Sequence, residues 1–181
     1  MDVCGVVSFV ERLPIGDGET ERLAAEECRQ VDDALERQLQ AGINHYEIIM
    51  DDYIGLTAAI SLRMDELVFY NIHYTAVILW EEQAACWPEP TRDWWFRAFQ
   101  ECSKEIILES RLTEKNREKR DQYLLDHCHK LLLFTTGPSA EADALAGRAE
   151  AAGLAVERRA LPWSRCGLTD WAAESKIKGG N

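Results

Sequence analysis

The grouping of apolar residues along the first part of the chain predicts a strand, a helix and a second strand. Residues 3–10 are rich in valine and phenylalanine, and residues 43–50 form another apolar run that ends at two aspartates. Between these runs, four apolar residues in the range 28–39 recur at spacings of three and four, which places them on one face of a helix. We expect this helix to occupy residues 17–42, because an aspartate can cap its start and a glycine can end it.

The middle of the chain has a less regular pattern. Residues 53–63 fit a helix only in part, and the interval 67–80 is dense in β-branched and aromatic residues. That composition favours strand, broken near Asn71 because a single strand of this length would be unusual. A helix is then expected to start at Thr91 and to carry an apolar stripe as far as Ile106.

The last part of the chain predicts a parallel strand–helix–strand unit. Residues 111–122 are nearly all charged, which indicates a solvated helix or an exposed connection. Residues 131–134 then form a strand, Ser139 caps a helix, and residues 154–161 form another strand. The short links predict a right-handed parallel crossover. A short terminal helix is expected to start at Thr169.

Two clusters of strands with helices between and after them predict an α/β fold. We expect a mixed sheet covered by helices in a three-layer sandwich, and a two-layer α+β sheet is the alternative. The length of 181 residues suits one domain, which we place at residues 1–178, with residues 179–181 as a frayed tail.

Charge is distributed unevenly along the chain. The net charge is −12, yet residues 1–110 carry 22 acidic and 8 basic residues, and residues 111–181 carry 10 acidic and 12 basic ones. The acidic part would repel nucleic acid, so nucleic acid is not expected as its direct ligand. It favours a protein partner with a basic surface, and the alternative is that acidity only keeps the protein in solution.

The chain is expected to be a soluble protein of the reducing cytoplasm. No apolar run has the length of a membrane-spanning helix, so no membrane association is predicted. The apolar start is short and has no leading basic residue, unlike a secretory signal. Six scattered cysteines without a C-x-x-C pair are typical of structural thiols.

Two groups of residues are candidates for binding a protein partner. Trp87 and Trp94 belong to an aromatic segment that follows the central strands, and exposed tryptophans often anchor protein interfaces. Asp32 and Asp33 supply negative charge in the acidic part of the chain. The alternative is that these tryptophans only cover the edges of the core.

The ends of two predicted strands offer candidates for binding a small ligand. Asp51 and Asp52 follow the second strand, and Thr135, Thr136 and Ser139 lie between the strand at 131–134 and its helix. Open α/β sheets bind ligands at the carboxyl ends of their strands, and the amides of a helix N-terminus can hold an anion. The alternatives are an acidic turn and an ordinary loop.

His127 and His129 are weak candidates for metal ligands. They belong to the only dense cluster of ligand-type side chains, but a metal site would need further donors from elsewhere in the chain. The alternative is a polar helix end. No cofactor is predicted.

The sequence leaves two hypotheses of function. The first is a non-catalytic, acidic protein-binding factor, such as an adaptor, an inhibitor or an immunity-like protein. The second is a small α/β enzyme or a domain that binds a nucleotide or metal ligand at its strand ends. No nucleophile motif or glycine-rich phosphate loop points to a particular reaction.

Overall fold

A computed structural model describes residues 2–10, 18–66, 71–85 and 87–161. Within these ranges six strands form one sheet in the order β4-β3-β2-β1-β5-β6. The strands are β1 (Val3–Phe9), β2 (His45–Ile49), β3 (His73–Ile78), β4 (Lys104–Ile107), β5 (Lys130–Thr135) and β6 (Ala155–Ala160).

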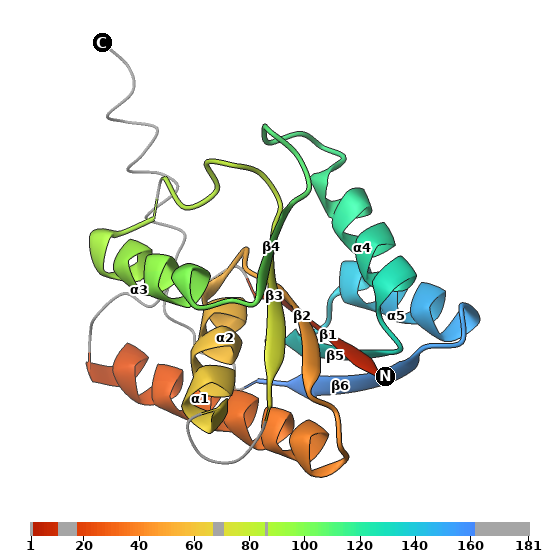
Figure 1. Ribbon diagram of the computed structural model, residues 1–181, viewed down its shortest axis with the longest axis horizontal. Helices are drawn as coiled ribbons and strands as arrows, with labels where there is room; N and C mark the ends of the chain where they lie inside the picture. Colours follow the sequence, from red (N-terminus) through yellow and green to blue (C-terminus); the bar gives the residue numbers. More distant parts are fainter. Residues whose placement is uncertain (1, 11–17, 67–70, 86, 162–181) are drawn as a thin grey trace.

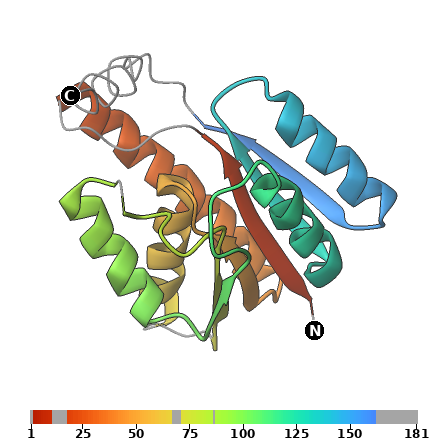
Figure 2. The ribbon, with the colours of Figure 1, turned by 90° about the horizontal axis from the view of Figure 1, so that it is seen from above.

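Five helices cover the two faces of this sheet (Figure 1). Their bounds are α1 (Gly18–Gln40), α2 (Tyr53–Glu66), α3 (Glu89–Gln100), α4 (Asn116–His127) and α5 (Ala140–Ala151). Seen from above, α1, α2 and α3 lie on one side of the strands, and α4 and α5 lie on the other (Figure 2). The predicted three-layer α/β fold is therefore confirmed.

The core explains why the central strands are continuously apolar. Val6 of β1 and Ile48 of β2 belong to the apolar cluster under α1, α2 and α3. Their neighbours Val7 and Ile49 belong to the cluster under α4 and α5. Successive side chains of a strand point to opposite faces, and both faces of this sheet are covered, so both sets of positions are apolar.

The mixed character expected for the sheet is not found, because all five strand pairs are parallel. Each consecutive pair of strands is joined through one helix, and such a crossover returns the chain in the same direction. β4 was missed from the sequence. It has only four residues, and three of them are exposed at the sheet edge.

The ambiguous residues after β2 form the helix α2. Its glycine, Gly55, packs under the end of β2, where an added Cβ would lie 1.9 Å from the carbonyl oxygen of Ile49. The glycine thus permits a close approach of helix and strand rather than ending the helix. Of the strand predicted at 67–80, residues 73–78 form β3, and residues 67–70 lie outside the described residues.

The helix expected from Thr91 begins two residues earlier, after Pro88. Pro90 lies in its first turn, where a missing backbone N–H costs no hydrogen bond, and Thr91 is buried instead of capping the helix. The helix ends at Gln100, so Ile106 is a residue of β4 and not of a helical stripe.

The strand–helix–strand unit at the end of the chain is confirmed. The Ser139 hydroxyl accepts a hydrogen bond from the amide of Ala142 at 3.2 Å and caps α5. Gly153 follows the helix with a φ of +86°, a conformation that glycine adopts easily. β5 and β6 then pair in parallel. The terminal helix expected from Thr169 and the tail at 179–181 lie outside the described residues.

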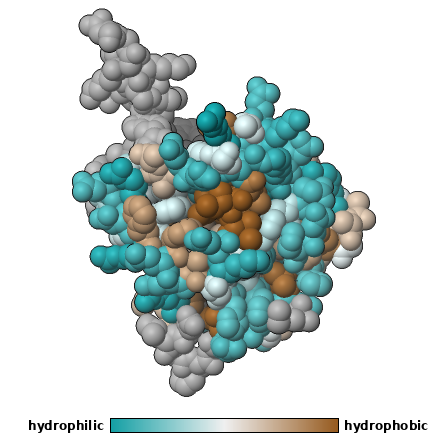
Figure 3. Space-filling model, turned by 45° about the horizontal axis from the view of Figure 1, so that its top comes forward, coloured by the Kyte–Doolittle hydropathy of each residue, from teal (hydrophilic) through white to brown (hydrophobic). Residues whose placement is uncertain are grey.

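The surface is mostly polar on the face shown in Figure 3, where hydrophobic residues gather in one patch near the centre. No helix in the described part of the chain is long and apolar enough to cross a membrane.

Candidate functional site

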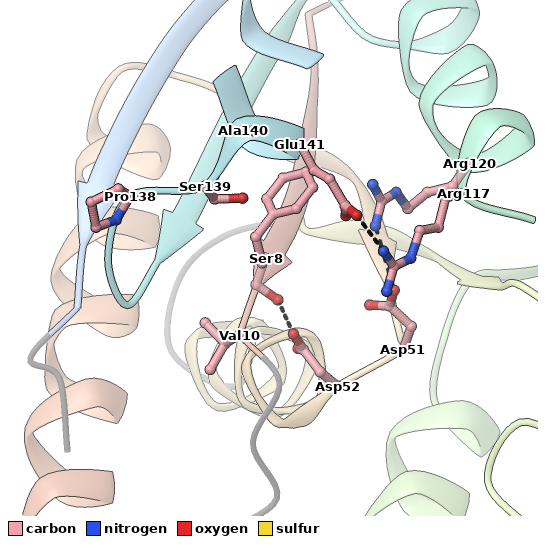
Figure 4. Close-up of a pocket in the computed structure, with 11 residues that line it drawn as sticks. Ser8, Val10, Asp51, Asp52, Arg117, Arg120, Pro138, Ser139, Ala140 and Glu141 are labelled. Atoms are coloured by element: carbon pink, nitrogen blue, oxygen red, sulfur yellow. Dashed lines mark hydrogen bonds and ion pairs between the residues drawn. The ribbon is translucent and has the colours of Figure 1, made fainter. Parts of the chain in front are cut away.

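A pocket of about 430 Å³ opens where the strand order of the sheet reverses direction, between β1 and β5. In open parallel sheets this point leaves a crevice at the carboxyl ends of the strands. Residues from the ends of β1 and β2, from α4 and from the start of α5 line the pocket (Figure 4). Its lining is Ser8, Phe9, Val10, Asp51, Asp52, Arg117, Arg120, Pro138, Ser139, Ala140 and Glu141.

Asp52 is held by three hydrogen bonds. Its Oδ1 accepts from the amides of Ile54 at 2.9 Å and Gly55 at 3.0 Å, so the side chain caps α2. Its Oδ2 accepts from the hydroxyl of Ser8 on the neighbouring strand (Figure 4). These bonds fix the carboxyl group at the pocket wall.

Asp51 lies beside Asp52 and faces a buried arginine. Its Oδ2 is 3.7 Å from Nη1 of Arg120. Its Oδ1 is buried and has no hydrogen-bond partner among the described residues. A buried carboxyl oxygen without a donor costs free energy, so this position favours the protonated form of the Asp51 carboxyl.

Arg120 is buried in a network of charges. Its Nε and Nη2 donate to Oδ1 of Asp121 at 2.9 and 2.8 Å, and Arg148 pairs with the other oxygen of the same carboxylate. The guanidinium also lies 4.8 Å from the centre of the Phe9 ring. These contacts hold the arginine in a defined position behind the pocket.

The other side of the pocket can attract an anion. Ser139, which caps α5, and Ala140 and Glu141 in its first turn line the pocket, so the positive end of the helix dipole lies at the pocket wall. Arg117 is exposed and pairs with Glu141 across the mouth of the pocket (Figure 4). An exposed pair of this kind is weak, so an anionic ligand can replace the glutamate.

Burial and the neighbouring Asp51 carboxylate raise the pKa of Asp52 to about 7. The hydrogen bonds from Ser8, Gly55 and Ile54 oppose this rise. Burial also raises the pKa of Asp51, against the attraction of Arg120. The carboxyl pair therefore holds a proton close to neutral pH, which is a common property of functional sites.

The structure brings together three of the five residues proposed from the sequence for a small ligand. Asp51, Asp52 and Ser139 line the pocket, whereas Thr135 and Thr136 are not part of its lining. Ser8, Arg117 and Arg120 were missed. The strand end at Ser8 has no unusual neighbour in the sequence, and both arginines belong to the stretch that the charge pattern assigned to a solvated helix.

The four candidate residues for partner binding lie in different environments in the structure. Asp32 and Trp94 line one groove between α1, α2 and α3. Asp33 pairs instead with Arg29 at 2.9 Å on the same helix. Trp87 is partly buried against the core, as the alternative interpretation expected, and is not part of that groove.

The two histidines proposed as metal ligands lie at the opposite edge of the sheet from the pocket. Nδ1 of His127 donates to the carbonyl of Tyr123 at 2.8 Å, and Nδ1 of His129 accepts from the amide of Val3 at 3.3 Å. In the described part of the chain, no three histidine, cysteine or acidic residues are arranged to hold a metal ion.

The comparisons with known proteins concern the fold. No protein-family model matches the chain, and no curated protein matches it. Among solved structures, it is similar to DNA processing protein A (DprA) from Streptococcus pneumoniae, with a TM-score of 0.50 and 12% sequence identity. The match covers 99% of this chain and 57% of that one, so this chain spans little more than half of its length. At this identity the similarity shows a shared fold.

Proposed function

We propose that this chain is a ligand-binding α/β domain whose pocket between β1 and β5 holds a small ligand with both a phosphate and hydroxyl groups. Nucleotides and sugar phosphates are the ligands of this class. The observation that carries the proposal is the meeting of two unlike groups in one pocket: the carboxyl groups of Asp51 and Asp52, and the N-terminus of α5 capped by Ser139. The volume of about 430 Å³ lies in the usual range for small-ligand sites.

Each group supports one part of the ligand. The amides at the start of α5 and the guanidinium of Arg117 supply donors for a phosphate. Asp52, fixed by Ser8 and the amides of α2, supplies an acceptor for ligand hydroxyls.

Calorimetric titration with AMP, ribose 5-phosphate and adenosine tests this proposal. We expect AMP and ribose 5-phosphate to bind and adenosine to bind at least about tenfold more weakly, because it lacks the phosphate. Arg117→Gln should weaken AMP binding by about tenfold. Arg158→Gln is the matched control, since Arg158 is similarly exposed but pairs with Asp143. Neither Arg158 nor Asp143 lines the pocket.

Equal binding of AMP and adenosine, or an equal loss of affinity in the two arginine variants, would contradict the proposed phosphate position. If neither AMP nor ribose 5-phosphate binds, nucleotides and sugar phosphates are excluded as the ligands of this pocket.

A second candidate function is the one that the charge pattern predicts, namely binding to a protein with a basic surface. It is supported by the groove that contains both Asp32 and Trp94, an acidic and an aromatic residue of the kind that partner binding needs. Retention of this chain by an immobilised basic protein, and its release by moderate salt, tests the idea. Passage through such a matrix at low salt would count against it.

A further inference from the structure

The groove between α1, α2 and α3 has a volume of about 510 Å³, larger than that of the pocket at the strand ends. These three helices cover one face of the sheet, away from α4 and α5 (Figure 2). The groove has an apolar floor and wall and an acidic rim. Its apolar lining includes Tyr53, Ile60, Met64 and Trp94, and the exposed Asp32 and Glu36 form the acidic rim.

Two of the apolar residues are unusually exposed. Met64 at the end of α2 is 64% exposed and Trp94 on α3 is 48% exposed. Both line the same groove, so exposed apolar surface from α2 and α3 meets at one concave site. Concave apolar surface with polar edges is typical of interaction sites.

In the described part of the chain, no basic side chain pairs with the acidic rim. Asp32 accepts a hydrogen bond from the hydroxyl of Ser61, and Glu36 accepts one from the side-chain amide of Gln40 at 3.1 Å. Neither has an ion pair among the described residues, whereas the neighbouring Asp33 pairs with Arg29. The groove therefore offers two carboxylates without an ion pair from the described residues, together with an exposed indole ring.

We propose that this groove binds a helical segment of a partner protein that carries arginine or lysine together with apolar side chains on one face. This inference rests on the second candidate function and assigns it a site. The apolar side chains of the segment would cover Met64 and Ile60. A guanidinium would lie between the Trp94 ring and the carboxylates of Asp32 and Glu36, where cation–π and ionic attraction add. The acidic charge of residues 1–110 would accelerate the encounter.

Fluorescence anisotropy with two labelled helical peptides tests the proposal on the full chain. One peptide carries leucine and arginine on one face, and the other has glutamate in place of arginine. We expect only the arginine peptide to bind. Trp94→Ala and Asp32→Asn should each weaken its binding by about tenfold, through loss of the ring and of the charge.

Matched controls separate this groove from general charge attraction. Asp33→Asn removes the same charge one residue away, and Phe96→Ala removes an exposed ring from α3 that does not line the groove. Both should leave the affinity within about twofold. Equal losses for Asp32→Asn and Asp33→Asn would overturn the groove assignment while leaving the basic-partner function standing.

Equal binding of both peptides would overturn that function as well. A concentration-dependent dimer in sedimentation that Trp94→Ala abolishes would assign the groove to a second copy of the chain and overturn the proposal.

Discussion

The hydroxyl of Ser8 at the end of β1 donates a hydrogen bond to Oδ2 of Asp52, the residue that caps α2. This bond links the carboxyl end of β1 to the turn between the neighbouring strand β2 and helix α2. The other oxygen of Asp52 is taken by the amides of Ile54 and Gly55. The carboxyl group thus caps α2 and also lines the pocket, so its protonation is expected to affect both stability and binding.

The raised pKa of Asp52 predicts a pH dependence of stability. A carboxyl whose pKa rises from about 4 in the unfolded chain to about 7 in the folded protein stabilises the fold in its protonated form. Its contribution is complete below about pH 4 and is lost as the pH rises through about 7. Asp52→Asn, which keeps a capping oxygen, should therefore be more stable than the wild type at pH 8 by about 1–2 kcal/mol. Urea unfolding of both proteins at pH 5 and pH 8 measures the difference, and a less stable variant at pH 8 would contradict it.

The network behind the pocket predicts a large effect at Asp121. Its carboxylate bonds to the buried guanidinium of Arg120 and to Arg148, so Asp121→Asn removes the counter-ion of Arg148 and leaves Arg120 only the more distant carboxylate of Asp51. We expect a loss of about 2–4 kcal/mol in the free energy of unfolding. Asp126→Asn on the exposed side of the same helix should change it by less than about 0.5 kcal/mol. Comparable losses for the two variants would mean that the buried network does not stabilise α4.

Two glycines in helices should respond to alanine in opposite ways. At Gly55 the new Cβ would lie 1.9 Å from the Ile49 carbonyl oxygen, so Gly55→Ala must displace α2 from β2. A destabilisation of about 3 kcal/mol or more is expected. At Gly147 of α5 nothing lies within 4 Å of the added atom, and alanine should stabilise the helix by up to about 1 kcal/mol. Thermal unfolding of the two variants checks both signs.

The cap of α5 allows stability and ligand binding to be separated. Ser139→Ala removes the hydrogen bond to the Ala142 amide and should cost about 1 kcal/mol. Ser139→Asp keeps a capping oxygen and should preserve stability, but its negative charge beside the helix amides should weaken AMP binding by at least about tenfold. Ser139→Asn is the neutral control that keeps both properties. If the aspartate variant binds AMP as well as the asparagine variant, the phosphate does not lie at this helix.

The sequence predicted those parts of the fold in which the local pattern and the tertiary environment agree. The apolar runs before Asp51 and Thr135 were recognised as strands because both faces of the sheet are buried there. The helix starting after Ser139 was recognised from its cap. The short edge strand β4 was missed, since its exposed Lys104 and Glu105 show no strand pattern.

Residues of the site could be predicted only where a local sequence pattern places them at the pocket. Asp51 and Asp52 were found because they follow a clear strand, and general rules place ligands there. Arg120 was assigned to a solvated stretch because its burial depends on Asp121, on Arg148 and on the ring of Phe9. These partners belong to α4, α5 and β1, and no local sequence pattern indicates that the three segments contact one another.

The proposed function requires that the end of β2 and the start of α5 form one ligand site. A titration of the isotopically labelled protein with AMP, followed by the amide resonances, tests it most directly. We predict that the amides of Ala140 and Glu141 and those of Ile54 and Gly55 shift together, with one common affinity. Shifts that are confined to other segments, or that follow different affinities at the two places, would contradict it.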